Sequence, residues 1–95
     1  MKSDSEKALN NKAVSLLNLG KPDEAIRELD KALKLSPNNC ALMNNKAVAL
    51  IEMKRPEDAL NILDEIIQID PTFFKAYNNK GTIYFGLKNL KESFN

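Results

Sequence analysis

The chain has 95 residues, enough for one small domain, and 43% of them are hydrophobic and 28% charged, which is the balance of a folded globular protein. Its formal net charge of +1 gives no reason to expect nucleic acid or an anionic membrane surface as a partner. The sequence contains no histidine, no tryptophan and a single cysteine, Cys40. This composition removes the commonest general base and zinc ligand, excludes an internal disulfide, and favours a reducing cytoplasm.

A repeated quartet sets the organisation of the chain. "NNKA" begins at Asn10 and again at Asn44, and "NNKG" begins at Asn78, so that each copy starts 34 residues after the previous one. Pro22 and Pro56 keep the same spacing. A fixed period of this length predicts an array of repeated supersecondary units.

The first unit is expected to contain two amphipathic helices. Apolar residues at helical spacing predict a first helix that ends near Gly20 and a second that begins at Pro22, since glycine suits a left-handed helix end and proline the first helical turn. Asp23 and Glu24 would favour the positive end of the second helix dipole. The motif "SPNN" ends this second helix.

The later units follow the same plan. In the second unit we expect helices over 42–52 and 59–69, with breaks at "MKRPED" and "DPT". In the third unit we expect one helix over about 73–86, followed by the stub of a second helix with Asn89 as its N-cap. Nothing alternates with period two for long, so the expected fold class is all-α.

Pro37 and Pro71 close two units whose residue sizes and spacing resemble the tetratricopeptide repeat (TPR), a 34-residue helix–turn–helix unit. The small residues of the first helices are Ala13, Ala47 and Gly81. The resemblance implies a right-handed TPR superhelix, an α-solenoid of antiparallel helix hairpins, with two full repeats and a partial third. It implies a single domain over 1–95, with repeats over about 6–39 and 40–73 and a partial repeat over 74–95. The chain is most similar to archaeal and bacterial arrays.

The sequence departs from the family pattern at two places. Ile66 stands where a small alanine is usual, which implies slightly wider packing in the second unit. Lys12, Lys46 and Lys80 occupy a position that is often leucine. We expect their stems to cover apolar surface while the ammonium groups reach water.

The resemblance also implies a concave groove lined by the first helix of every unit. Carried over to this chain, it places the second asparagine of each quartet in one row, similar to the asparagine ladder in the TPR region of O-linked N-acetylglucosamine transferase. Such a row would hydrogen-bond the backbone of an extended peptide. Lysines would attract a negatively charged peptide, and apolar side chains would line one side of the groove. The expected peptide-binding residues are Asn11, Asn45, Asn79, Lys7, Lys75, Val48, Ile51 and Phe85.

Two other interpretations of the asparagines stay open. The quartets are also explained by duplication alone, with the amides on a solvated face. The first asparagines of each pair, Asn10, Asn44 and Asn78, are expected to face solvent at the edge of the groove.

The carboxylate clamp that binds the acidic C-terminus of heat-shock chaperones is a second family pattern. Asn45 and Lys75 match it, but Asn10, Val14 and Asn79 stand at the other three positions. Two matches do not form the bidentate grip, so we do not expect chaperone-tail binding through this clamp.

Lysine outnumbers glutamate on the first helices, which would give the groove a mildly positive potential and favour an acidic protein or peptide partner. No catalytic, cofactor or metal site is expected. The carboxylates of the adjacent pairs Asp23–Glu24 and Asp64–Glu65 diverge on a helix, and Cys40 has no histidine to activate it. The expected function is therefore a protein–protein interaction module of the cytoplasm. The alternatives are a structural or assembly scaffold that self-associates or belongs to a larger array, and a duplicated scaffold without a ligand.

The C-terminal unit raises the question of what covers its apolar face. The residues that would lack a covering helix are Tyr77, Ile83, Tyr84, Leu87 and Phe94. Three explanations are open: the chain continues as a longer array, the stub folds over this face, or two copies form a two-fold homodimer through it.

Overall fold

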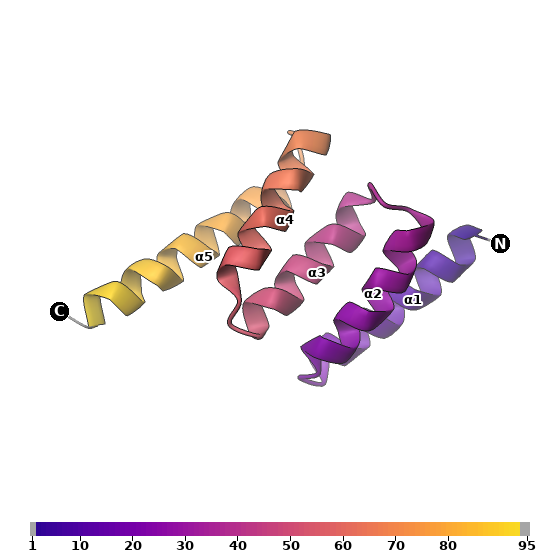
Figure 1. Cartoon of the computed structure of the whole chain (residues 1–95), viewed down its shortest axis with the longest axis horizontal. Helices are drawn as coiled ribbons and strands as arrows, with labels where there is room; N and C mark the ends of the chain where they lie inside the picture. Colours follow the sequence, from indigo (N-terminus) through magenta and orange to yellow (C-terminus); the bar gives the residue numbers. More distant parts are fainter. Residues whose placement is uncertain (1, 94–95) are drawn as a thin grey trace.

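The computed structural model describes the backbone of residues 2–93 and the side chains of residues 5–86. This part of the chain forms five helices: α1 (Lys2–Asn18), α2 (Pro22–Leu35), α3 (Cys40–Glu52), α4 (Pro56–Ile69) and α5 (Phe74–Ser93). Two antiparallel hairpins, α1–α2 and α3–α4, are followed by α5 as the first helix of a third unit (Figure 1). The prediction of an all-α fold with two full helical repeats and a partial third is confirmed.

The helices form two layers. In Figure 1, α2 lies in front of α1, α4 lies in front of the start of α5, and α3 is seen between α2 and α4. Each second helix is packed between two first helices, α2 between α1 and α3, and α4 between α3 and α5. Within the described residues, no helix is long and apolar enough to span a bilayer.

The two hairpin turns have the same hydrogen-bond pattern. Gly20 and Lys54 both adopt the left-handed conformation, with φ of 77° and 62°. The amide of the following residue then reaches back into the last helical turn, from Lys21 to the Leu16 carbonyl at 2.8 Å and from Arg55 to the Leu50 carbonyl at 2.9 Å. This is the Schellman C-cap, and a proline at the first position of the next helix completes each turn.

The expected stub of a second helix in the third unit is wrong, because α5 continues without a break to Ser93. The 34-residue period puts Lys88 at the place of Gly20 and Lys54, and Leu90 at the place of the two prolines. Leucine keeps its backbone N–H and has no ring to clash with the preceding turn, so the helix has no local reason to end there. Phe94 and the side chain of Leu87 lie outside the described residues.

The core follows the repeat. Its buried side chains form two clusters in which alanines allow close helix contacts and leucine, isoleucine or methionine fill the space between. Ile66, at the position where the family has alanine, is fully buried in the second cluster. The members are Ala13, Ala25, Leu29, Ala32 and Leu42 in the first cluster, and Met43, Ala47, Leu50, Ala59, Leu63, Ile66, Ala76 and Ile83 in the second.

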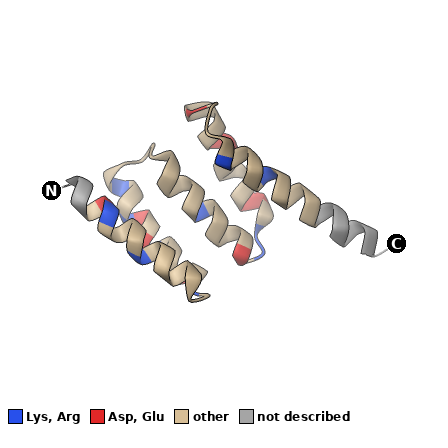
Figure 2. Ribbon diagram, turned by 180° about the vertical axis from the view of Figure 1, so that it is seen from behind, with Lys and Arg blue, Asp and Glu red and all other residues tan. Residues whose placement is uncertain are grey.

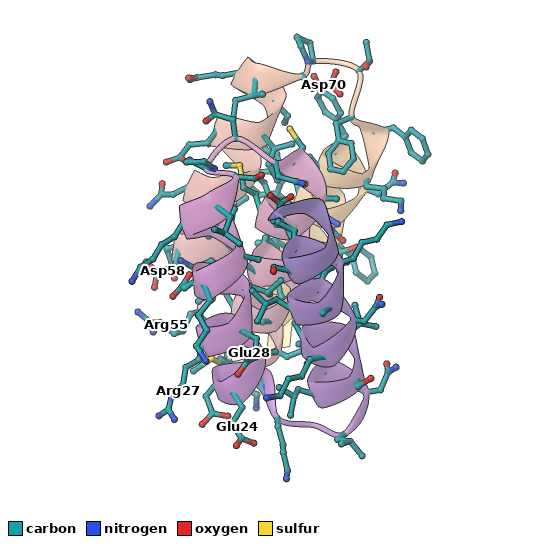
Figure 3. The ribbon with its side chains drawn as sticks, turned by 90° about the vertical axis from the view of Figure 1, so that its right-hand side faces the viewer. Glu24, Arg27, Glu28, Arg55, Asp58 and Asp70 are labelled. Atoms are coloured by element: carbon teal, nitrogen blue, oxygen red, sulfur yellow. The ribbon has the colours of Figure 1, made fainter. Side chains whose placement is uncertain are left out.

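Asp70 organises the turn between α4 and α5 (Figure 3). Its Oδ1 accepts hydrogen bonds from the Thr72 hydroxyl at 2.6 Å and from the Thr72 backbone N–H at 3.0 Å. These bonds favour the ionised carboxylate and lower the pKa of Asp70, the hydroxyl contributing most. Because the folded pKa is lower than the unfolded value of about 3.9, this contribution to stability is present above that value. It is lost as the pH falls through the folded pKa.

We expect Thr72→Val to raise the pKa of Asp70 towards its ordinary value, because the larger of the two stabilising hydrogen bonds is removed. An NMR titration of the Asp70 side-chain carboxyl between about pH 2 and pH 6 measures this shift. Thr72→Ser retains the hydroxyl and should leave the pKa where it is in the unmodified chain. Equal pKa values in the valine and serine variants would contradict this role of Thr72.

Candidate functional site

The residues expected in the groove all belong to the first helices, α1, α3 and α5, whose side of the molecule faces the viewer in Figure 2. Four of them are half-buried and four are exposed. The half-buried ones are Asn45, Asn79, Val48 and Ile51, and the exposed ones are Asn11, Lys7, Lys75 and Phe85. All eight side chains therefore reach the surface, as a ligand would require.

The paired asparagines bind one another across the repeats. Asn45 Nδ2 donates to Asn10 Oδ1 at 2.7 Å, and Asn79 Nδ2 donates to Asn44 Oδ1 at 2.7 Å. In each case the second asparagine of one unit bonds the first asparagine of the unit before it. These bonds join α3 to α1 and α5 to α3, where the helices of one layer meet.

The expectation that the first asparagines face solvent is wrong for two of them. Asn44 is buried, with 8% of its surface exposed, and Asn10 is half-buried. Only Asn78 is exposed, because no further unit within the described residues supplies an amide to it. A buried amide needs a hydrogen-bond partner, and the neighbouring repeat provides it.

The lysines of the quartets also bind the preceding unit. Lys46 Nζ lies 2.7 Å from Asp30 Oδ1 on α2, and Lys80 Nζ lies 2.7 Å from Asp64 Oδ1 on α4. Both pairs keep the 34-residue period, and the hydrogen bond that Lys80 donates to Asp64 raises the pKa of Lys80. The sequence did not predict that these ammonium groups pair with carboxylates of the preceding unit.

Lys12 differs because the described residues contain no unit before α1. Its ammonium lies 3.5 Å from Glu28 Oε1 within its own hairpin, and its side chain is 64% exposed. Glu28 lies on α2, on the side near α1 (Figure 3). The repeated motif thus contributes to contacts between units. The second asparagine and the lysine bind side chains of the preceding unit, and the first asparagine accepts a hydrogen bond from the following unit.

These contacts leave the amides with further hydrogen-bonding capacity. An asparagine has two N–H donors and a carbonyl acceptor, so Asn45 and Asn79 each keep one N–H and the oxygen for another partner. The Asn11 amide has no partner among residues 5–86. The arrangement fixes the orientation of two of the three amides that were expected to form the row.

Two hollows lie along the first helices. One, of about 250 Å³, is lined by Glu6, Lys7, Asn10, Asn39, Ala41 and Leu42. The other, of about 620 Å³, is largely apolar and is lined by Ile51, Lys54, Pro56, Glu57, Thr82, Ile83 and Gly86. They lie near opposite ends of α3. Pro56 and Glu57 were not expected here, because they belong to α4, a second helix. A comparison of equivalent positions in the repeats does not show that the start of α4 borders this hollow.

A further hollow of about 450 Å³ lies between α2 and α4, beside the Lys46–Asp30 pair. Its apolar lining comes from Leu33, Met43 and Ile62, and none of the expected groove residues takes part.

Cys40, at the start of α3, is half-buried. Burial raises the pKa of its thiol, with a smaller contribution from the Asp70 carboxylate. A raised pKa keeps the sulfur protonated at neutral pH and therefore a poor nucleophile. Among the described residues, no group of three or more potential ligands is placed to hold a metal ion.

Two family models, both described as tetratricopeptide repeat, match residues 16–80 and 74–95. No protein with a curated function matches the chain.

The first TPR of Spaghetti (RPAP3), solved with the HSP90 peptide SRMEEVD, is similar, with 29% identity and a TM-score of 0.82 over 95% of this chain and 71% of that one. The Hsp90 co-chaperone Cns1 from Saccharomyces cerevisiae is 26% identical, with a TM-score of 0.92 over 98% of this chain and 30% of that one. MamA from Desulfovibrio magneticus RS-1 is 25% identical, with a TM-score of 0.82 over 93% of this chain and 50% of that one. The chain thus spans half or less of the last two proteins. Because these relatives include a yeast and a bacterial protein, the narrower likeness to archaeal and bacterial arrays stays a prediction.

Proposed function

The chain belongs to the tetratricopeptide repeat family, a protein-interaction fold and not an enzyme, and from that premise we propose that it binds an extended, acidic segment of a cytoplasmic partner protein. The segment lies along α1, α3 and α5. Asn11, Asn45 and Asn79 hydrogen-bond its backbone.

The observation that carries this proposal is the pair of amide–amide bonds between repeats. Each bond, at 2.7 Å, fixes the side chain of Asn45 or Asn79 before any ligand arrives. A fixed donor and acceptor lose less conformational entropy on binding than a mobile side chain does. Backbone recognition by such amides tolerates many ligand side chains.

Charge and apolar surface give the ligand its expected chemistry. Lys7 and Lys75 are exposed near the starts of α1 and α5, where they attract a negatively charged segment. At the other end of α3, Ile51 lines the apolar hollow, and Phe85 is 66% exposed. An acidic segment that also carries an apolar side chain fits both ends, with Val48 contributing apolar contact between them.

The relative solved with SRMEEVD supports an acidic peptide as the class of ligand. This chain keeps only Asn45 and Lys75 of the five clamp positions. We therefore expect its affinity to depend on the peptide backbone and on overall charge, with no requirement for a chaperone-type C-terminal carboxylate.

Fluorescence anisotropy with labelled acidic peptides, SRMEEVD and acid-rich internal segments with blocked ends, tests the proposal. Lys75→Glu is expected to weaken binding about tenfold, because it replaces attraction by repulsion in the groove. The matched control is Lys34→Glu, which makes the same charge change at an exposed position of α2. It should leave the affinity nearly unchanged.

Asn11→Ala is the better test of the amide row than Asn45→Ala, because Asn45 also bonds Asn10 and its loss would disturb the fold. We expect Asn11→Ala to weaken binding several-fold without lowering stability. The proposal fails if no acidic peptide binds, or if Lys34→Glu and Lys75→Glu weaken binding equally.

A further inference from the structure

One face of α5 is uncovered, although the equivalent faces of α1 and α3 are covered by the second helix of their own hairpin. We call Tyr77, Gly81 and Tyr84 the open face of α5. The equivalent residues are Leu9, Ala13 and Leu16 in α1, and Met43, Ala47 and Leu50 in α3. In α1 and α3 this face lies against the second helix of the same hairpin, and Ala13 and Ala47 are fully buried. In α5, Tyr77 is 48% and Tyr84 54% exposed.

Gly81 has no structural reason to be small within the described chain. A Cβ built on it would meet nothing within 4 Å. Glycine inside a helix costs about 1 kcal/mol relative to alanine, and the two earlier quartets have alanine here. At Ala13 and Ala47 the small side chain lets a second helix approach closely. A glycine between two exposed tyrosines indicates the same kind of contact with a helix from outside the described chain.

We propose that the open face of α5 binds the open face of α5 in a second copy of the chain, with the two helices antiparallel about a two-fold axis. In this arrangement the partner's α5 takes the place relative to α5 that α2 has relative to α1. The proposal concerns a face different from the peptide groove and does not depend on peptide binding.

The spacing of the open face supports a second copy as the occupant. Tyr77 lies four residues before Gly81 and Tyr84 three residues after it. In an antiparallel pair with glycine opposite glycine, residue 77 faces residue 85, so Tyr77 of each copy lies within one residue, about 1.5 Å along the helix axis, of Tyr84 of the other. The face has a tyrosine on each side of the central glycine, so its residue order is nearly the same in both chain directions. Such a face suits an isologous contact, in which both copies use the same residues. Pairs of aromatic rings would add to the stability of the contact.

The lysine next to Gly81 does not oppose this contact. Lys80 is next to Gly81, but its ammonium is directed to α4, where it lies 2.7 Å from Asp64 Oδ1. In Figure 1, α4 covers one side of α5. One helix pair buries less surface than most stable dimer interfaces, so we expect a dissociation constant on the order of 10 µM.

Sedimentation equilibrium of the full chain from about 1 µM to about 500 µM tests the proposal, since this range brackets the expected dissociation constant. We expect a monomer–dimer equilibrium that Gly81→Glu weakens at least about tenfold, because it places a charge at the centre of the contact. Gly86→Glu is the matched control: Gly86 is also in α5 and also has nothing within 4 Å of a built Cβ. It should dimerise like the unmodified chain.

Three outcomes would overturn the proposal: a monomer throughout the range, equal effects of the two glutamate substitutions, or a mass that grows past the dimer. Circular dichroism of both variants shows whether they are folded, and Tyr84→Ala gives a second test without a new charge. Asn11→Ala should leave the dimer intact, which separates failure here from failure of the peptide groove.

Discussion

Replacing Asn44 by alanine is expected to lower the free energy of unfolding by about 1–2 kcal/mol, even though alanine is the better helix former. Asn44 is 8% exposed and its Oδ1 accepts the Asn79 amide at 2.7 Å. Truncation deletes this bond between α3 and α5 and leaves the half-buried Asn79 without its partner. Equilibrium urea denaturation followed by circular dichroism measures the change.

The repeat provides a control at the same place in the motif. Asn78 is equivalent to Asn44, but it is exposed and its side chain has no partner among residues 5–86. Asn78→Ala should therefore raise stability slightly, by roughly 0.5 kcal/mol, through helix propensity alone. If Asn44→Ala and Asn78→Ala change stability by the same amount, the asparagines do not hold the repeats together.

The largest loss of stability is expected for Leu63→Ala, about 3 kcal/mol. Leu63 is fully buried in the cluster that joins α3, α4 and α5, so the substitution removes apolar contacts and leaves a cavity. A domain of this size has a total stability of about 5–15 kcal/mol, and the effect should be visible as a much lower urea midpoint.

Leu19→Ala makes the same chemical change at a leucine that is 70% exposed. It lies in the turn after α1 and should alter stability by no more than about 0.5 kcal/mol. Similar losses at the two leucines would mean that the second cluster is not the stabilising core.

The features that the sequence predicted well are local or periodic. Gly20 and the prolines Pro22 and Pro56 act through the backbone conformation of their own turns, so spacing alone predicts where the hairpins reverse. The 34-residue period then identifies equivalent positions and the family. The small residues Ala13 and Ala47 are buried as the family pattern implies.

Contacts between repeats were harder to predict. Equivalence of Asn10, Asn44 and Asn78 predicts that their backbones are alike, but it does not predict side-chain partners. The partners of Asn10 and Asn44 lie 35 residues away in sequence. The end of the array also breaks the equivalence, since Asn78 has no following unit among the described residues. For the same reason the lysines were expected in water, whereas Lys46 and Lys80 bond aspartates of the preceding hairpin.

The stub of a second helix in the third unit was wrongly predicted because the period was extended past the residues that enforce it. The turn needs a residue that adopts a left-handed conformation and then a proline, and the chain has Lys88 and Leu90 at these places. Lysine adopts that conformation at Lys54, but there the turn is completed by Pro56 and by the packing of α4 on α3. Without the proline, continuing the helix is the lower-energy choice.

A double-mutant cycle on Asn44 and Asn79 is the most direct measurement of the claim that the repeated asparagines join one unit to the next. Each alanine variant and the double variant are unfolded in urea, and the coupling energy is obtained from the difference. Because the two amides bond at 2.7 Å, we expect a favourable coupling of about 1 kcal/mol. A parallel cycle on Asn11 and Asn78, the two amides without partners in the described residues, should be additive. Additivity in both cycles would contradict the account.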